Sequence, residues 1–391
     1  MDGKQDTEVV TDENETVPPL SSGSPDETDD LTFIPPDLAD EKDLTEEEKK
    51  KKKIRKIIGT VLFIIFNAVV LFFTARDDFS QKTPKFQGEP FSGKNIAFLA
   101  CSLLCFVLVL AIETVKYLLM MRHLGEKVSV RNAFETAALG KYYDCITPSG
   151  AGGQPFQIWN LMSHGYSNGA SSAMPLTSFV TMQFGFVILA LAMMIFSGVD
   201  TATGIRIAAY VGVFMYTIVP AMIVWSAISP KTSFAVVKFF VKIGAKIHIF
   251  KDPEKTLRKA EENLTNYSNN LKSIAKKPFL IITLLLLSIL YQAALCSIPY
   301  FVICTFGANI GFFESLAIVM YVYASITLIP TPGNSGAAEG SFYILFSRLE
   351  TSSLFWAMVV WRFLVFYLFI IVGLGIYGFR ALEKLLKRRK A

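Results

Sequence analysis

Two short stretches rich in Pro and Gly interrupt the apolar parts of this 391-residue chain: TPSGAGGQPF at residues 147–156 and TPGNSGAAEG at residues 331–340. In both stretches Pro follows Thr, and a Gly stands five positions after that Thr. Each of these three residues in the second stretch lies 184 positions after its counterpart in the first. Pro ends or kinks a helix, and Gly lets the backbone approach a neighbour or a ligand closely. The two matching breaks therefore predict that the chain contains an internal structural repeat.

The composition around these breaks is that of an integral membrane protein. Hydrophobic residues make up 52% of the chain and charged residues only 18%, with a mean hydropathy of +0.42, which excludes ordinary soluble domains. The net charge of +5 combines −10 over residues 1–53 with +15 over the remainder. We expect a disordered acidic tail with a terminal Lys run at 1–53, a polytopic membrane domain at 54–380 and a basic cytoplasmic C-terminus at 381–391.

Six segments are long and apolar enough to cross a bilayer. They are residues 54–74, 95–121, 171–197, 204–228, 279–304 and 353–379. If every Lys/Arg cluster between them faces the cytoplasm, each broken stretch must enter and leave the membrane on one side. The sequence thus predicts an all-α integral membrane protein with six transmembrane helices and two opposed re-entrant hairpins. This arrangement is an inverted repeat with both termini cytoplasmic.

The breaks also predict a binding site. A helix that restarts after a break turns unpaired N–H groups and its positive dipole end towards the gap, which favours an anion such as a lipid phosphate. The alternative is that both breaks are kinks where helices pack tightly. The candidate substrate-binding residues are Thr147, Pro148, Gly150, Gly152, Gly153 and Gln154 in the first break and Pro332, Gly333, Gly336 and Glu339 in the second.

Charged residues inside the apolar spans extend this site. Arg362 lies deep in the last span, where a charge is costly unless it faces a partner or water. Glu339 is its expected partner, and the pair is either a structural bridge or part of a phosphate site. Glu113 and Lys116 stand three residues apart, which favours a self-neutralising pair in which Lys116 snorkels. Asp144 precedes the first break and is expected to cap or charge it.

The stretch 231–277 is strongly basic, with 11 Lys/Arg against 4 Asp/Glu. Lys238, Lys242 and Lys246 recur every four residues with Phe and Ile between them, which predicts an amphipathic helix on the anionic inner leaflet. We expect no nucleic-acid partner. No metal, cofactor or ATP site is expected either, because the His residues lack metal-ligand spacing and the Gly cluster lacks the P-loop Lys.

The stretch from Tyr142 to Phe156 resembles the signature of the lysylphosphatidylglycerol synthase transmembrane family, and residues 330–340 resemble its second motif. The resemblance spans residues 54–380. It implies a multi-pass protein of the bacterial inner membrane that handles a lipid, often aminoacylated phosphatidylglycerol, and is linked to antibiotic resistance against cationic peptides. Members include the membrane region of the multiple peptide resistance factor. We expect the soluble aminoacyltransferase domain of that factor to be absent from this chain.

The expected function is that of a flippase-like translocase for an anionic or aminoacylated phospholipid such as lysylphosphatidylglycerol. The alternative is the membrane component of a lipid-modifying enzyme, either a phosphatidylglycerol lysyltransferase or a polyprenyl-phosphate-dependent transferase. No catalytic dyad can be assembled from the spacing of residues. A third interpretation is a membrane partner that recruits a separate soluble synthase. Because no ATP site is expected, transport is expected to run downhill or to couple to an ion gradient.

Overall fold

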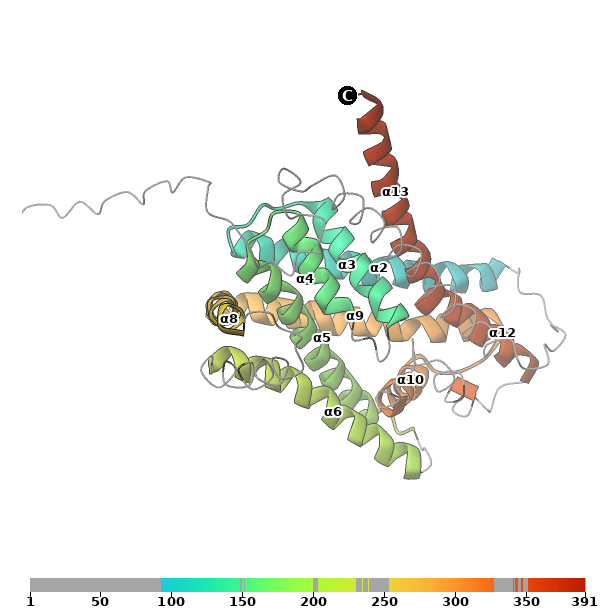
Figure 1. The fold of residues 1–391 in the computed structure, drawn as a ribbon. Helices are drawn as coiled ribbons and strands as arrows, with labels where there is room; N and C mark the ends of the chain where they lie inside the picture. Colours follow the sequence, from blue (N-terminus) through green and yellow to red (C-terminus); the bar gives the residue numbers. More distant parts are fainter. Residues whose placement is uncertain are drawn as a thin grey trace, which may run out of the picture. The chain divides into compact units, whose positions relative to one another are not determined.

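The computed structural model describes residues 93–147, 150, 152–199, 203–229, 234, 238, 253–326, 340, 342–343, 346 and 351–390. Every regular element in these ranges is helical (Figure 1). The helices are α2 (Gly93–His123), α3 (Val130–Ile146), α4 (Gly153–Ser163), α5 (Asn168–Phe196), α6 (Thr203–Ile228), α8 (Pro253–Ala275), α9 (Pro278–Thr305), α10 (Phe312–Ile326), α12 (Thr351–Arg362), the π-helix η1 (Phe363–Tyr367) and α13 (Leu368–Lys390).

Five helical segments of the described ranges are long and apolar enough to cross a membrane. They are Gly93–His123, Asn168–Phe196, Thr203–Ser226, Pro278–Thr305 and Leu354–Glu383. Each coincides within a few residues with one of the predicted spans, so the protein is an all-α integral membrane protein. The remaining predicted span, residues 54–74, lies outside the described residues. The total of six spans and the depth of the two hairpins stay predictions.

The long helices α2 and α9 pack against each other in opposite directions (Figure 1). His123 at the end of α2 is 3.3 Å from the Ser273 carbonyl oxygen, just before α9 begins, which is consistent with this antiparallel pairing. Helix α5 packs on α9 as well. A Cβ at Gly185 would lie only 2.9 Å from the Ser288 backbone, so this glycine allows the two helices to approach closely. The antiparallel α2–α9 pair agrees with the orientation that an inverted repeat requires.

The first broken stretch folds as two separate helices, α3 and α4, which pack on each other. Ser129 caps α3 by accepting a hydrogen bond from the Asn132 N–H. Helix α13 packs across α3, and Gly373 makes this contact close because a Cβ there would overlap the Tyr142 ring. The break between α3 and α4 is thereby held against the last helix of the chain.

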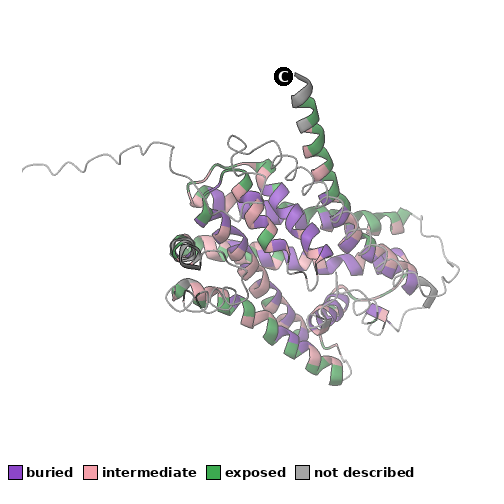
Figure 2. Cartoon of the chain, viewed as in Figure 1, coloured by how far each residue is buried: buried purple, intermediate pink, exposed green. Residues whose placement is uncertain are grey.

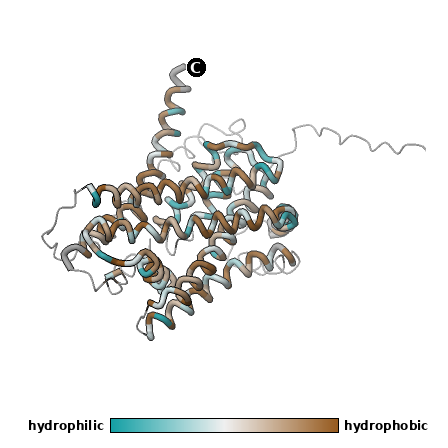
Figure 3. Tube along the Cα trace, turned by 180° about the vertical axis from the view of Figure 1, so that it is seen from behind, coloured by the Kyte–Doolittle hydropathy of each residue, from teal (hydrophilic) through white to brown (hydrophobic). Residues whose placement is uncertain are grey.

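Large apolar side chains cover the outward faces of the long helices. Phe196 is 82% exposed, Met222 is 66% exposed and Phe279 is 83% exposed. Exposed residues recur along α6, and hydrophobic residues dominate the long helices (Figures 2 and 3). Such extensive apolar exposure is costly in water but matches the hydrocarbon of a bilayer. These faces are therefore expected to contact lipid.

Helix α8 precedes α9 and packs against α5, α6 and α9. It lies within the basic stretch 231–277, for which the sequence predicts an amphipathic helix at residues 238–247. Lys238 is helical and exposed, whereas Lys242 and Lys246 lie outside the described residues. The predicted contact with an anionic leaflet stays a prediction.

Candidate functional site

The first break is closed by side chains of α3 rather than left open. Thr147 ends α3, and its hydroxyl donates to the Tyr143 carbonyl oxygen at 2.6 Å while accepting from the Gly152 N–H at 2.9 Å. Asp144 accepts from the Gly153 N–H at 3.1 Å. The expectation that Asp144 caps the break is thus confirmed. The expectation of unpaired N–H groups is wrong at Gly152 and Gly153, because α3 itself supplies their acceptors.

Glycine is required at two points of this closure. Gly150 has a φ of +63°, a left-handed conformation that other residues adopt only with strain. A Cβ at Gly153 would lie 2.8 Å from the Gly140 carbonyl oxygen and would overlap the Asp144 carboxylate. Gly153 therefore allows the start of α4 to approach the Asp144 side chain. Pro148, Ser149 and Ala151 lie outside the described residues.

The Asp144 carboxylate is the negatively charged group at the start of α4. It is 23% exposed and lies 3.6 Å from the Lys141 ammonium, which is itself 5.3 Å from the centre of the Tyr291 ring. Burial raises the pKa of Asp144 to about 6, although Lys141 and the Gly153 N–H favour the carboxylate. A lipid phosphate can therefore occupy the start of α4 only in exchange for this side chain.

A second charged group lies within the helix bundle on α2 and α5. The Lys116 ammonium donates to the Glu113 carboxylate and to the Ser178 carbonyl oxygen, both at 3.2 Å. The Ser178 hydroxyl donates to the other Glu113 oxygen at 2.6 Å. The predicted Glu113–Lys116 pair is confirmed. The expected snorkelling of Lys116 is wrong, because its side chain is fully buried and its hydrogen-bond partners lie inside the bundle.

Arg362 is buried at the end of α12, with 4% of its surface exposed. Its guanidinium carbon is 5.3 Å from the Phe366 ring centre and 5.8 Å from that of Trp361. Burial raises the pKa of the Cys145 thiol to about 12, while Lys141 and Arg362 oppose this rise. The predicted partner of Arg362, Glu339, lies outside the described residues.

The structure brings only part of the predicted site together. Across the first break, Thr147 accepts a hydrogen bond from Gly152 and Asp144 accepts one from Gly153. Gln154 is half-buried in the first turn of α4. Pro332, Gly333 and Gly336 of the second break lie outside the described residues. Substrate binding by these residues stays a prediction.

A buried polar cluster that the sequence interpretation did not include joins α3, α4 and α13. Glu135 accepts from the Arg131 guanidinium at 2.8 Å and from Arg380 Nε at 2.8 Å. Arg380 also donates to Asn160 Oδ1 at 2.8 Å. Burial favours the neutral Glu135, but the hydrogen bonds from Arg131 and Arg380 outweigh it and lower the pKa of this carboxyl. The four-residue spacing of Arg131 and Glu135 was a usable signal, whereas Arg380 is 245 residues away.

Comparisons with known proteins agree with a membrane assignment. The model of the family described as "Lysylphosphatidylglycerol synthase TM region" matches residues 56–373. The chain is also similar to a UPF0104 membrane protein of Archaeoglobus fulgidus. The two are 24% identical over 265 residues, which is 65% of this chain and 78% of that protein.

Proposed function

The chain belongs to the lysylphosphatidylglycerol synthase TM region family, and from this membership we propose that it is a flippase-like lipid translocase. It binds the headgroup of an anionic or aminoacylated phospholipid among the helices and moves it between leaflets while the acyl chains remain in the membrane. Family membership supports a role with lipids, and the charged groups within the bundle support a polar substrate.

The observation that carries this proposal is the burial of Arg362 inside the apolar segment Leu354–Glu383. A charge at such depth is uncommon and marks a pathway or a binding group by default. A guanidinium presents a planar set of donors that matches a phosphate better than an ammonium does. Since Asp144 already occupies the start of α4, the phosphate-binding role falls to Arg362 rather than to the unpaired N–H groups expected from the sequence.

The test uses the full chain in vesicles that contain a fluorescent phosphatidylglycerol, with quenching from outside to report the leaflet. We expect Arg362→Ala and Glu339→Ala each to lower the translocation rate at least tenfold while the protein still folds. Arg362→Lys retains the charge but not the planar donors, so we expect an intermediate rate. Lys127→Ala, at an exposed position after α2, serves as the control with an unchanged rate. Unchanged translocation in both alanine variants would exclude the proposed site.

The family description contains the word "synthase", which favours the membrane component of a lipid-modifying enzyme as the second candidate. The two functions differ in what happens to the lipid. An enzyme component changes the chemical composition of the lipid pool when its substrates are supplied, whereas a translocase leaves each lipid molecule unchanged. Mass spectrometry of the lipids before and after the vesicle assay therefore separates them.

A further inference from the structure

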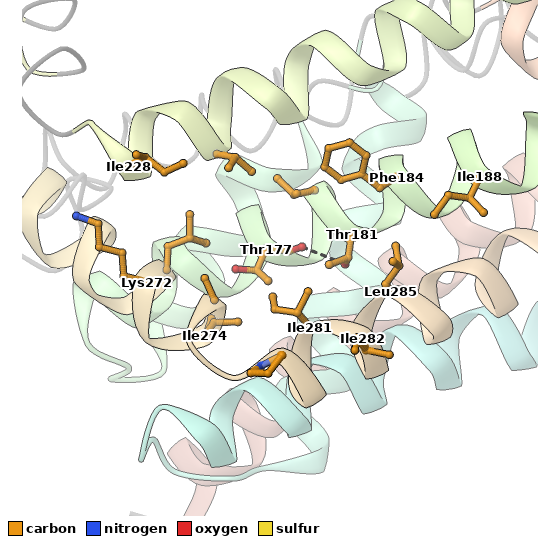
Figure 4. A pocket seen from close by; sticks show the side chains of 15 residues that line it. Thr177, Thr181, Phe184, Ile188, Ile228, Lys272, Ile274, Ile281, Ile282 and Leu285 are labelled. Carbon is orange, nitrogen blue, oxygen red and sulfur yellow. Dashed lines mark hydrogen bonds between the residues drawn. The ribbon is translucent and has the colours of Figure 1, made fainter.

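A cavity of about 650 Å³ lies between α5, α6, α8 and α9 (Figure 4). Its volume is within the range of sites that hold small molecules. Apolar side chains form its walls, with Thr177, Thr181 and Lys272 as the polar exceptions. None of these three residues belongs to the first break or to the Arg362 region, so the cavity is separate from these two parts of the site.

The cavity has a polar end and an apolar end. Lys272, in the last turn of α8, lies at one end near Ile228, whereas Ile188 and Leu285 lie at the other end (Figure 4). Ile188 is 45% exposed on the outward face of α5, so the apolar end opens towards the region where we expect lipid. The exposed Lys272 provides positive charge at the opposite end.

Thr177 adds a specific polar group inside the cavity. Thr177 is 3% exposed, and its hydroxyl makes no hydrogen bond within the part of the chain that the structure describes. Figure 4 shows this side chain directed into the space between α5 and α8. Because a buried hydroxyl without a partner is destabilising, a ligand that offers an acceptor at this point would be stabilised.

The order of groups along the cavity is cation, hydroxyl donor and long apolar wall. A glycerophospholipid has the complementary order, with a phosphate, an ester carbonyl and an acyl chain. We propose that the cavity binds one acyl chain of an anionic glycerophospholipid. The Thr177 hydroxyl donates to its ester carbonyl, and the Lys272 ammonium lies beside its phosphate.

This site shares a wall with the buried charges of α2. The Ser288 hydroxyl donates to the cavity-lining Thr181 at 3.1 Å, and Thr181 donates to the Ser178 carbonyl oxygen at 3.0 Å. That same carbonyl accepts from Lys116. The Ser178 carbonyl oxygen therefore links the cavity wall to the Glu113–Lys116 pair by hydrogen bonds. The inference rests on the proposed function for the identity of the ligand as a membrane phospholipid, but it concerns binding and not transport.

The test measures binding directly on the full chain in nanodiscs. The probe is a phosphatidylglycerol with a photoreactive diazirine along one acyl chain, and the labelled peptides are identified by mass spectrometry. We expect label on α5 between residues 177 and 188 and on α9 between residues 281 and 285. Val180→Trp fills the cavity and should reduce this label at least tenfold. The matched control is Val107→Trp on the 54% exposed outward face of α2, which should leave the label unchanged.

Two further variants test the polar contacts. Thr177→Val keeps the shape but removes the hydroxyl, and we expect about threefold to tenfold weaker binding from the loss of one hydrogen bond. Lys272→Gln should abolish the preference for phosphatidylglycerol over phosphatidylcholine, whereas Lys94→Gln, at the start of α2, should retain it. Label that is unaffected by Val180→Trp overturns the proposal. Equal labelling by a free fatty-acid probe, or an unchanged headgroup preference in Lys272→Gln, overturns the assignment to an anionic phospholipid. If the chain shows no translocation in the vesicle assay but is still labelled in this cavity, the proposed function is contradicted and the lipid site is retained.

Discussion

Asp144 connects the two helices of the first break. Its carboxylate accepts a hydrogen bond from the Gly153 backbone N–H, nine residues later, and faces the Lys141 ammonium, three residues earlier. The same residue has a pKa raised to about 6 by burial. The charge of Asp144 therefore changes within a pH range that is readily measured, and this change affects the closure of the break.

The raised pKa predicts a pH dependence of stability. The folded chain holds a proton on Asp144 between about pH 4 and pH 6, where the unfolded chain has already released it. Stability contributed by this group therefore falls as pH rises through this range and stays low above it. Asp144→Asn retains an acceptor for the Gly153 N–H but does not titrate. We expect the melting temperature to fall more steeply from pH 4.5 to 7 in the original chain than in this variant, and equal slopes would contradict the raised pKa.

The buried Glu113–Lys116 pair gives a second prediction for single residues. Lys116→Met leaves the Glu113 carboxylate buried without its cation, which costs about 3–5 kcal/mol of stability. The double variant Lys116→Met with Glu113→Leu removes both charges, so we expect it to recover most of this loss. Thermal unfolding in detergent measures the difference, with the exposed Lys127→Met as control. A double variant as unstable as the single one would show that the pair is not self-neutralising.

At the scale of elements, the polar cluster around Glu135 ties α13 to α3 and α4. Among the side chains that the structure describes, two salt bridges connect α13 to α3, and they differ in burial. Glu135 and Arg380 are 5% and 19% exposed, whereas Arg131 and Glu383 are 50% and 36% exposed. Burial strengthens a charge-assisted hydrogen bond, whereas water and salt weaken an exposed one.

Double-mutant cycles on the two bridges test this difference. We expect a coupling of about 1.5–3 kcal/mol between Glu135→Gln and Arg380→Gln, and below about 1 kcal/mol between Arg131→Gln and Glu383→Gln. The free energy of unfolding in a mild detergent is the measured quantity. Raising the salt concentration should weaken only the second coupling. Equal couplings would mean that the α13 contact depends on packing, such as that of Gly373 on Tyr142, rather than on the buried cluster.

At the scale of the whole molecule, the sequence was most informative where the physical signal is local. Five predicted spans match helices. A stretch of about twenty apolar residues in a bilayer satisfies its backbone hydrogen bonds best as a helix. Asp144 lies only nine residues before Gly153, whose N–H donates to its carboxylate. The burial of Lys116 was missed because helical spacing places it next to Glu113 but says nothing of Ser178 on α5. Glu135 with Arg380, and the cavity between four helices, depend on contacts between distant segments and had no sequence signal.

In the proposed function, the chain moves phospholipid between leaflets without altering it. The most direct measurement labels the phospholipids of each leaflet selectively in cells with and without the chain and quantifies total lipids in parallel. A translocase predicts a changed distribution of an anionic or aminoacylated phospholipid between the leaflets, with total amounts of each lipid unchanged. An unchanged distribution, or a distribution that changes only because one lipid is newly made or lost, would contradict it.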